Sequence, residues 1–229
     1  MKLTLVEHKV EEPNVESFIF KPAEALSWKA GQFLRYTLPH EPVDERGTSR
    51  WFTIASTPFE KVVQLTTRFS EKNGSTFKKA LRALQIGDEV EASGADGSFV
   101  IGEGASRPYV FIAGGIGITP FRAILKQTQH ENMPITATLL YANRDEHIIF
   151  KEELEALTQD IPNLKIHYIL SPQHIDENTI KKLVPDLQKP LWYISGPEPM
   201  VEGVTKTLQT MNVSTDQMKR DWFPGYSAE

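Results

Sequence analysis

The 229-residue sequence contains no cysteine. This absence excludes a disulfide framework, a cysteine-ligated zinc or iron–sulfur site, and catalysis by a cysteine nucleophile. The six histidines are scattered along the chain, and no two of them have the HxxxH or HExxH spacing of a zinc enzyme. We therefore predict no metal site.

Long apolar runs and an excess of basic residues are also missing. No stretch approaches the roughly 18–20 apolar residues that a membrane-spanning helix needs. Residues 1–14 carry acidic side chains where a secretory signal peptide has an apolar run. The net charge of −5 argues against nucleic acid or an anionic membrane surface as the main partner. We therefore expect a cytoplasmic protein with no membrane span and no nucleic-acid partner.

The first hundred residues are filled by short segments rich in β-branched and aromatic side chains. Proline, glycine or charged turns bound these segments, which is typical of strands in a sandwich or barrel. Phe77, Leu81 and Leu84 recur at helical spacing after Ser75 or Thr76, which predicts one short helix among the strands. The expected strands lie around residues 3–5 and over residues 15–20, 33–38, 51–55, 62–69 and 88–92.

The second half of the chain has a different periodicity. Continuous apolar runs alternate with amphipathic, helix-like stretches, and this pattern predicts a parallel sheet with helices on both faces. The change falls in the small-residue linker 102–108, so we expect two domains, residues 1–103 and residues 104–229. The expected strands cover 109–113, 135–141, 164–170 and 191–195, and the expected helices cover 120–129, 151–159, 179–184 and 197–211.

Residues 111–120 have the strongest local pattern for ligand binding. An apolar strand runs into Gly114, Gly115 and Gly117, and a helix then opens at Thr119 and Pro120. Glycines let the backbone approach a phosphate, and the free N–H groups at a helix start favour an anion. The spacing is not GxGxxG, so the usual dinucleotide fingerprint does not apply. A tight strand-to-helix turn without a ligand is the alternative interpretation.

Residues 50–56 form a second candidate. Along a strand, Arg50 and Phe52 point to one face and Trp51 and Thr53 to the other. An arginine can pair a phosphate, an aromatic ring can stack on a planar ring, and a threonine can bond a ring heteroatom. The alternative is a surface arginine beside aromatic residues of the core. A third candidate is the strand–turn–helix junction around 195–200, because ligands of open α/β sheets bind at the carboxyl ends of strands.

Taken together and in this order, these stretches resemble the ferredoxin–NADP reductase superfamily. The resemblance implies a flavin-binding antiparallel Greek-key β-barrel, residues 1–103, followed by a Rossmann-like NAD(P)-binding α/β domain with a parallel sheet, residues 104–229. It covers nearly the whole chain. The motifs that carry it are residues 31–33 (GQF), 50–56 (RWFTIAS), 74–77 (GSTF), 94–99 (GADGSF), 114–120 (GGIGITP), 141–144 (YANR) and 195–200 (SGPEPM).

The resemblance implies roles for individual residues. Arg50, Ser75 and Thr76 would hold the flavin pyrophosphate, and Thr53 stands where a hydroxyl faces flavin N5, the hydride acceptor. Ser195 would flank the nicotinamide ring, so Thr53 and Ser195 are the expected catalytic residues. The expected flavin contacts are Arg50, Trp51, Phe52, Thr53, Thr67, Gly74, Ser75 and Thr76. The expected contacts of the nicotinamide cofactor are Gly114, Gly115, Gly117, Thr119, Pro120, Asn143, Arg144, Ser195, Gly196 and Pro197.

Some positions depart from the family pattern. Ser195 stands where members often have cysteine, and the glycine–serine spacing before the expected pyrophosphate helix is compressed. Phe223 and Tyr226 are expected either to lie against the flavin or to belong to a core-packing tail. Arg144 can pair the 2′-phosphate of NADPH, whereas Phe150 lacks the hydroxyl that would bond it, so NADPH and NADH both remain open.

The function implied is that of an FAD-dependent NAD(P)H reductase, in which NAD(P)H delivers a hydride to bound FAD. Since the chain has no cysteine for a cluster, the electrons would pass to a separate ferredoxin, flavodoxin or haem protein, or to a small molecule. One alternative is an NAD(P)H:flavin reductase that uses free flavin as a substrate. A non-catalytic flavin- or nucleotide-binding subunit is the alternative from another class.

Overall fold

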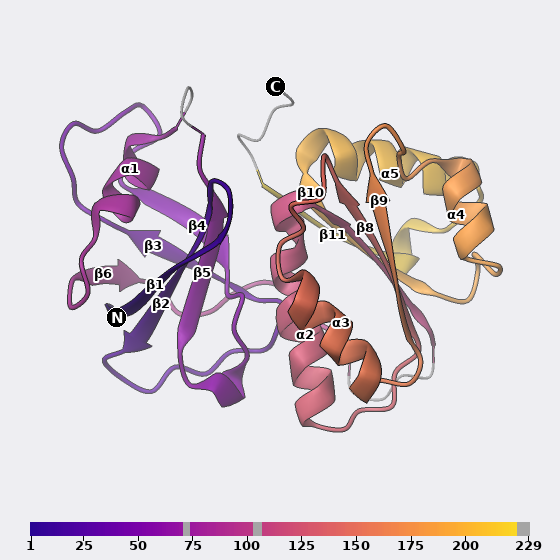
Figure 1. The fold of residues 1–229 in the computed structure, drawn as a ribbon, viewed down its shortest axis with the longest axis horizontal. Helices are drawn as coiled ribbons and strands as arrows, with labels where there is room; N and C mark the ends of the chain where they lie inside the picture. Colours follow the sequence, from indigo (N-terminus) through magenta and orange to yellow (C-terminus); the bar gives the residue numbers. More distant parts are fainter. Residues whose placement is uncertain (71–73, 103–106, 224–229) are drawn as a thin grey trace. The chain divides into compact units, whose positions relative to one another are not determined.

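A computed structural model describes residues 1–70, 74–102 and 107–223 of the chain (Figure 1). The chain divides into two compact units, Met1–Val100 and Ile101–Glu229. The boundary expected after residue 103 lies outside the described residues. No helix in the described parts of the chain combines the length and the apolar character that crossing a bilayer requires.

The first unit is an antiparallel, barrel-like sheet with the strand order β4-β3-β6-β1-β2-β5. Its core consists of alternate strand residues such as Leu5, Phe18 and Leu34, all fully buried, and Phe77 of α1 packs against them. β1 is longer than expected because it continues past two register shifts in its pairing with β2. The elements are β1 (Lys2–Glu12), β2 (Val15–Pro22), β3 (Phe33–Thr37), β4 (Ser49–Thr53), η1 (Pro58–Glu60), β5 (Val63–Arg68), α1 (Thr76–Ala83) and β6 (Glu89–Ala92).

The second unit is a five-stranded parallel sheet with the strand order β11-β10-β7-β8-β9. The expected fold class, an antiparallel barrel-like domain followed by a parallel α/β domain, is therefore confirmed. The elements are β7 (Tyr109–Gly114), η2 (Gly115–Ile118), α2 (Thr119–His130), β8 (Ala137–Asn143), α3 (Lys151–Asp160), β9 (Leu164–Leu170), α4 (Glu177–Leu183), β10 (Leu191–Pro197), α5 (Glu198–Thr210), η3 (Thr215–Gln217) and β11 (Met218–Phe223).

Helices cover both faces of this sheet, with α2 and α3 on one face and α4 and α5 on the other (Figure 1). On the first face, the ring of Phe111 stacks on Phe121 of α2, with 5.0 Å between the ring centroids. On the opposite face, Ile112 and Trp192 belong to a buried cluster that includes Leu208 of α5. β7 is buried along its whole length because it is the central strand, which explains its continuous apolar run.

β11 is the one strand of this sheet that the sequence reading did not contain. It is parallel to β10 at the edge of the sheet, and among the described side chains of residues 218–222 Met218 is the one buried apolar residue. An edge strand needs no continuous apolar run, so the pattern that identified the other four strands is absent here.

Candidate functional site

The winding of the parallel sheet marks one crevice as the candidate nucleotide site. From the central strand β7, the chain adds β8 and β9 on one side and then returns to place β10 and β11 on the other. The direction of winding reverses between β7 and β10, and ligands of open α/β sheets bind outside the carboxyl ends of the strands at such a switch point. The residues there are Gly114 and η2 after β7, and Ser195, Gly196 and Pro197 at the end of β10. These are residues that the sequence predicts as cofactor contacts.

The three glycines of the turn after β7 have different reasons to be glycine. A Cβ on Gly117 would overlap the backbone of Ser195, and a Cβ on Gly114 would overlap the side chain of Met200. Gly115 has φ +50°, and an added Cβ there would meet no described atom within 4 Å. Close packing against β10 therefore explains Gly117, packing against Met200 of α5 explains Gly114, and Gly115 is the one whose backbone faces open space.

Thr119 and Pro120 open α2 as expected, but the threonine hydroxyl is occupied. Its Oγ1 donates a hydrogen bond of 3.2 Å to the carbonyl oxygen of Ile116, and Thr119 is only 2% exposed. Pro120 lies in the first turn of the helix, where a missing N–H costs nothing. Both residues shape the start of α2. An anion at this helix start would be bound by the backbone N–H groups rather than by the Thr119 hydroxyl.

A carboxyl group that sequence reasoning missed lies beside Ser195. β10 and β11 pair in register so that Asp221 is opposite Ser195, and the Ser195 hydroxyl donates a 3.5 Å hydrogen bond to Asp221 Oδ2. Ser195 is fully buried, and burial raises the pKa of Asp221 to about 6. Recognising residues 218–223 as a parallel edge strand would have placed this carboxyl at the site.

Asn143 and Arg144 lie at the carboxyl end of β8, the neighbour of β7. The Nδ2 of Asn143 is buried and has no hydrogen-bond partner among the described residues, while Arg144 is exposed. Phe150, at the start of α3, lies under the guanidinium of Arg122, which is 5.0 Å from the ring centroid and is paired with Glu153. An exposed arginine and an orphaned amide are therefore available to a ligand at this edge.

The first unit contains the second candidate site, at the start of α1. Ser75 is the N-cap, and its Oγ accepts a 3.2 Å hydrogen bond from the N–H of Lys78. Gly74 has no room for a Cβ, which would lie 2.7 Å from the carbonyl oxygen of Ser70. The N–H of Thr76 donates a 2.9 Å hydrogen bond to Asp44 Oδ2, and Thr76 Oγ1 accepts one of 3.1 Å from the N–H of Asp44. The expected pyrophosphate contacts are thus engaged by the chain itself.

Arg50 lies at the same place. Its Nη1 donates hydrogen bonds to the carbonyl oxygens of Ser49 and Gly47, at 2.6 and 3.2 Å, and its guanidinium lies 5.5 Å from the centroid of the Phe77 ring. Its Nη2 is buried without a hydrogen-bond partner among the described residues and lies 3.6 Å from Asp44 Oδ1. An orphaned guanidinium N–H beside a helix start fits a phosphate, so the residues present fit the cofactor that the resemblance implies.

The remaining residues of the predicted flavin set do not all gather at this helix start. Phe52 packs between Tyr36 and Phe77, with centroid distances of 5.8 and 6.0 Å, and so contributes to the barrel core. Thr53 and Thr67 are 5% and 1% exposed. Trp51 is 59% exposed, although alternation predicts the same face for it as for Thr53. Phe223 ends β11, but its side chain and Tyr226 lie outside the described residues.

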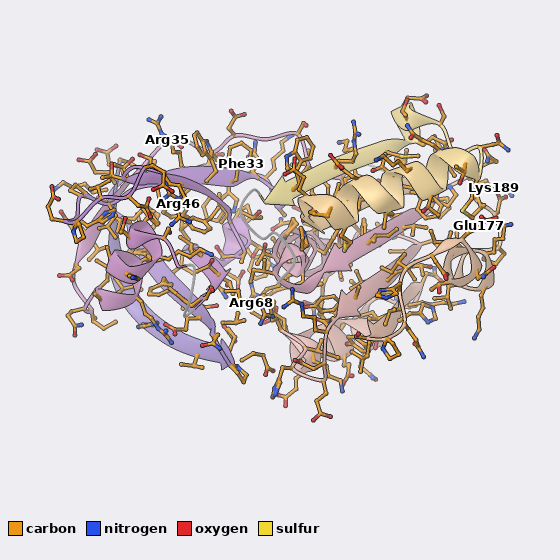
Figure 2. The ribbon with its side chains drawn as sticks, turned by 90° about the horizontal axis from the view of Figure 1, so that it is seen from above. Phe33, Arg35, Arg46, Arg68, Glu177 and Lys189 are labelled. Carbon is orange, nitrogen blue, oxygen red and sulfur yellow. The ribbon has the colours of Figure 1, made fainter. Side chains whose placement is uncertain are left out.

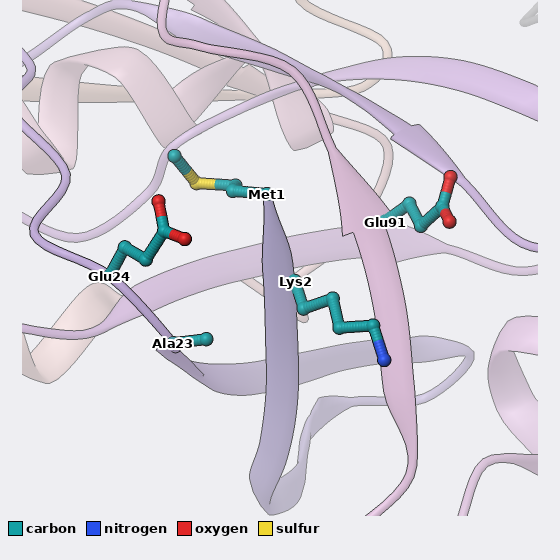
Figure 3. Close-up of a pocket in the computed structure, with 5 residues that line it drawn as sticks. All are labelled: Met1, Lys2, Ala23, Glu24 and Glu91. Atoms are coloured by element: carbon teal, nitrogen blue, oxygen red, sulfur yellow. The ribbon is translucent and has the colours of Figure 1, made fainter.

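Neither the surface hollow nor the acidic and histidine side chains of the described residues provide a further candidate site. The hollow shown in Figure 3 is lined by Met1, Lys2, Ala23, Glu24 and Glu91, and none of the predicted residues lines it. Within residues 1–70, 74–102 and 107–223, no three histidine, aspartate or glutamate side chains come together as metal ligands.

Comparison with known proteins agrees with this geometry. The domain family described as "Oxidoreductase NAD-binding domain" matches residues 111–206. Flavohemoprotein B of Dictyostelium discoideum is 26% identical over 93% of this chain and 56% of its own length. Ferredoxin–NADP reductase B of Sorangium cellulosum is 31% identical over 69% of this chain and 65% of its own length.

Solved structures share the two-unit fold. The FAD/NAD-binding domain of a Vibrio cholerae nitric oxide dioxygenase superposes with a TM-score of 0.83 at 21% identity, over 97% of this chain and 98% of that one. The chain spans 56–59% of the length of the curated relatives that match it over nearly its whole length. Residues 111–206 therefore match an oxidoreductase NAD-binding domain, and the chain as a whole is similar to FAD/NAD(P)-binding oxidoreductases of the ferredoxin–NADP reductase type.

Proposed function

We propose that this protein is an FAD-dependent NAD(P)H reductase that passes electrons to a separate acceptor. One observation carries the proposal: the switch point between β7 and β10 brings the open backbone of Gly115 together with Ser195 and Asp221. The backbone of Gly115 fits a nucleotide phosphate. The partly buried pair of the Ser195 hydroxyl and the Asp221 carboxyl suits an uncharged polar group such as a carboxamide.

Each residue has a limited task in this proposal. Arg50 and the N–H of Thr76 bind flavin phosphate, and the N–H groups at η2 and α2 bind the phosphates of the nicotinamide cofactor. Asp221 accepts the Ser195 hydrogen bond and thereby fixes the direction of that hydroxyl. Bound FAD supplies the redox chemistry, because flavins accept hydride and release electrons singly. The protein contributes binding, orientation and the exclusion of water.

The acceptor and the preferred nucleotide belong to the finer part of the proposal. The relatives are named flavohemoproteins and ferredoxin reductases, which favours a haem or iron–sulfur protein as the acceptor. The 229 residues have no cysteine for a cluster, so the acceptor's cluster would lie outside them. Arg144 is exposed at the end of β8, where it can pair a 2′-phosphate, and this supports NADPH alongside NADH.

The test is the visible absorption spectrum of the purified protein before and after anaerobic addition of NADH or NADPH. The proposal expects a flavin spectrum that bleaches with at least one nucleotide, and the one that bleaches it faster is the preferred donor. A flavin spectrum that neither nucleotide bleaches would contradict the proposal and leave a binding-only subunit.

A second function is favoured by one observation, the carboxylate of Asp44 at the start of α1. If this carboxylate keeps flavin from being held tightly, the protein would instead reduce free flavin as a diffusing substrate. A colourless protein that oxidises NAD(P)H only when flavin is added would establish this second function.

A further inference from the structure

The polar loop 39–49, which joins β3 to β4, is fastened to the start of α1. His40 contributes its Nε2 to a 2.9 Å hydrogen bond with Thr76 Oγ1, and its Nδ1 to one of 2.7 Å with the carbonyl oxygen of Leu38. The N–H of Gly47 donates to the carbonyl oxygen of Asp44 at 2.9 Å and closes a turn. The loop therefore presents Asp44 to the helix start in a defined direction.

Asp44 behaves there as a bound anion. Its Oδ2 accepts hydrogen bonds from the N–H of Thr76 at 2.9 Å and from Arg46 Nη2 at 2.7 Å, and its Oδ1 accepts from the N–H of Arg46 at 3.0 Å. The hydrogen bond from Thr76 and that from Arg46 hold the pKa of this carboxyl well below its usual range. Arg46, labelled in Figure 2, belongs to the same loop as Asp44 and forms an ion pair with it. A helix N–H and an arginine are the donors that would otherwise bind a phosphate oxygen.

We propose that Asp44 is a built-in competitor of the flavin phosphate: it occupies the phosphate position at the start of α1 and lowers the affinity for flavin. This inference rests on the proposed function, since it assumes that the flavin phosphate binds between Arg50 and Thr76. A diphosphate offers more charge and more oxygens than one carboxylate, so it can displace Asp44 and gain the same donors.

Arg50 indicates that the carboxylate does not use the whole site. Arg50 Nη2 forms an ion pair with Asp44 Oδ1 at 3.6 Å, beyond hydrogen-bonding distance, and has no hydrogen-bond partner among the described residues. If Asp44 only fastened the loop, its carboxylate would be expected to accept a hydrogen bond from Arg50 Nη2, because a buried donor without a hydrogen bond is costly. A larger anion can bond Arg50 and Thr76 at once. The Asp44 carboxylate therefore occupies this position only until the flavin phosphate displaces it.

The test compares flavin affinity in wild type, Asp44→Asn and Glu45→Gln, after any bound flavin has been removed. Glu45 is the matched control because it lies in the same loop, changes the net charge by the same amount and is 86% exposed in its side chain. We expect Asp44→Asn to bind FAD about tenfold more tightly, the effect of about 1.4 kcal/mol, and Glu45→Gln to bind like wild type. Quenching of flavin fluorescence measures the affinity without turnover. Inorganic pyrophosphate, followed by thermal shift, serves as a second probe that contains no flavin ring.

The possible outcomes separate the inference from the proposed function. If the variant and wild type bind FAD equally, or if the variant binds it more weakly, Asp44 is not a competitor, even when bound flavin still bleaches with NAD(P)H. If pyrophosphate binds the variant more tightly but neither protein binds flavin, the competition stands and the proposed function fails. If Asp44→Asn does not fold, Asp44→Ser keeps an oxygen acceptor for the N–H of Thr76 without the charge, and the same increase is expected.

Discussion

Both units contain a helix start at which an anion is expected, and they differ in what stands there. In the first unit, the chain supplies its own anion, because the Asp44 carboxylate accepts a hydrogen bond from the N–H of Thr76 at the start of α1. In the second unit, glycine packing against β10 shapes the turn before α2, and Gly115 meets no described atom within 4 Å of an added Cβ. A helix start attracts any anion, so the loop that lies beside it decides which anion it receives.

The largest effect is expected from Gly117→Ala, which tests the packing half of this comparison. The added Cβ would overlap the backbone of Ser195, which cannot move without disturbing β10. We expect a loss of about 3 kcal/mol in the free energy of unfolding, measured by denaturant titration. Gly115→Ala is the control. Its positive φ costs about 1 kcal/mol, but it has open space, so it should weaken NAD(P)H binding more than stability. Equal losses of stability for the two variants would contradict this division of roles.

The two carboxyl groups of the candidate sites are expected to respond oppositely to pH. Asp221 has its pKa raised to about 6 by burial, so its ionisation opposes folding. The free energy of unfolding is not lowered by this ionisation below the unfolded pKa of about 3.9. The loss grows as the pH rises to about 6 and then stays near 3 kcal/mol. Asp44, with a lowered pKa, instead stabilises the fold above its unfolded pKa and loses this contribution as the pH falls.

The variant Asp221→Asn tests whether ionisation of Asp221 lowers the stability of the fold. The variant should be more stable than wild type at pH 7.5, by about 3 kcal/mol at most, and the difference should vanish toward pH 4. Chemical denaturation at a series of pH values measures it. A variant that is less stable than wild type at pH 7.5 would show that the ionised carboxylate is held by favourable contacts.

Arg50→Ala tests the claim that the barrel unit binds phosphate even though Asp44 stands there. Removing the guanidinium should weaken FAD binding by about 2 kcal/mol, roughly thirtyfold, because a charge-assisted hydrogen bond is lost. Arg35→Ala is the matched control, since Arg35 is exposed on the neighbouring strand β3 (Figure 2). Unchanged flavin affinity in Arg50→Ala would place the phosphate elsewhere.

The smallest effect is expected from Ser195→Ala. The hydroxyl is proposed to orient the nicotinamide rather than to transfer a proton, so flavin content should be unchanged. We expect the rate of flavin bleaching by NAD(P)H to fall about tenfold, as for one lost orienting hydrogen bond of about 1.4 kcal/mol. Anaerobic stopped-flow absorbance measures this rate. A rate equal to that of wild type would remove Ser195 from the catalytic set.

Much of the fold could be predicted from the sequence because most strands and helices have a local pattern of apolar and capping residues. The apolar run at 109–113 became the buried central strand β7, and Ser75 became the N-cap of α1. β11 could not be predicted, because an edge strand whose described side chains include one buried apolar residue, Met218, has no continuous apolar run. For the site, motif order pointed to Arg50, Gly115 and Ser195. Asp44 and Asp221 were missed because their partners lie 32 and 26 residues away.

The sequence by itself determined the two-part organisation, the parallel and antiparallel sheets, and the helix starts, because periodicity, capping and glycine placement act over a few residues. Only the tertiary structure decided which groups meet at those helix starts. The β3–β4 loop brings Asp44 to Thr76, and parallel pairing at the sheet edge sets Asp221 opposite Ser195. Such contacts depend on loop direction and strand register, and these are settled by the packing of the whole unit rather than by neighbouring residues.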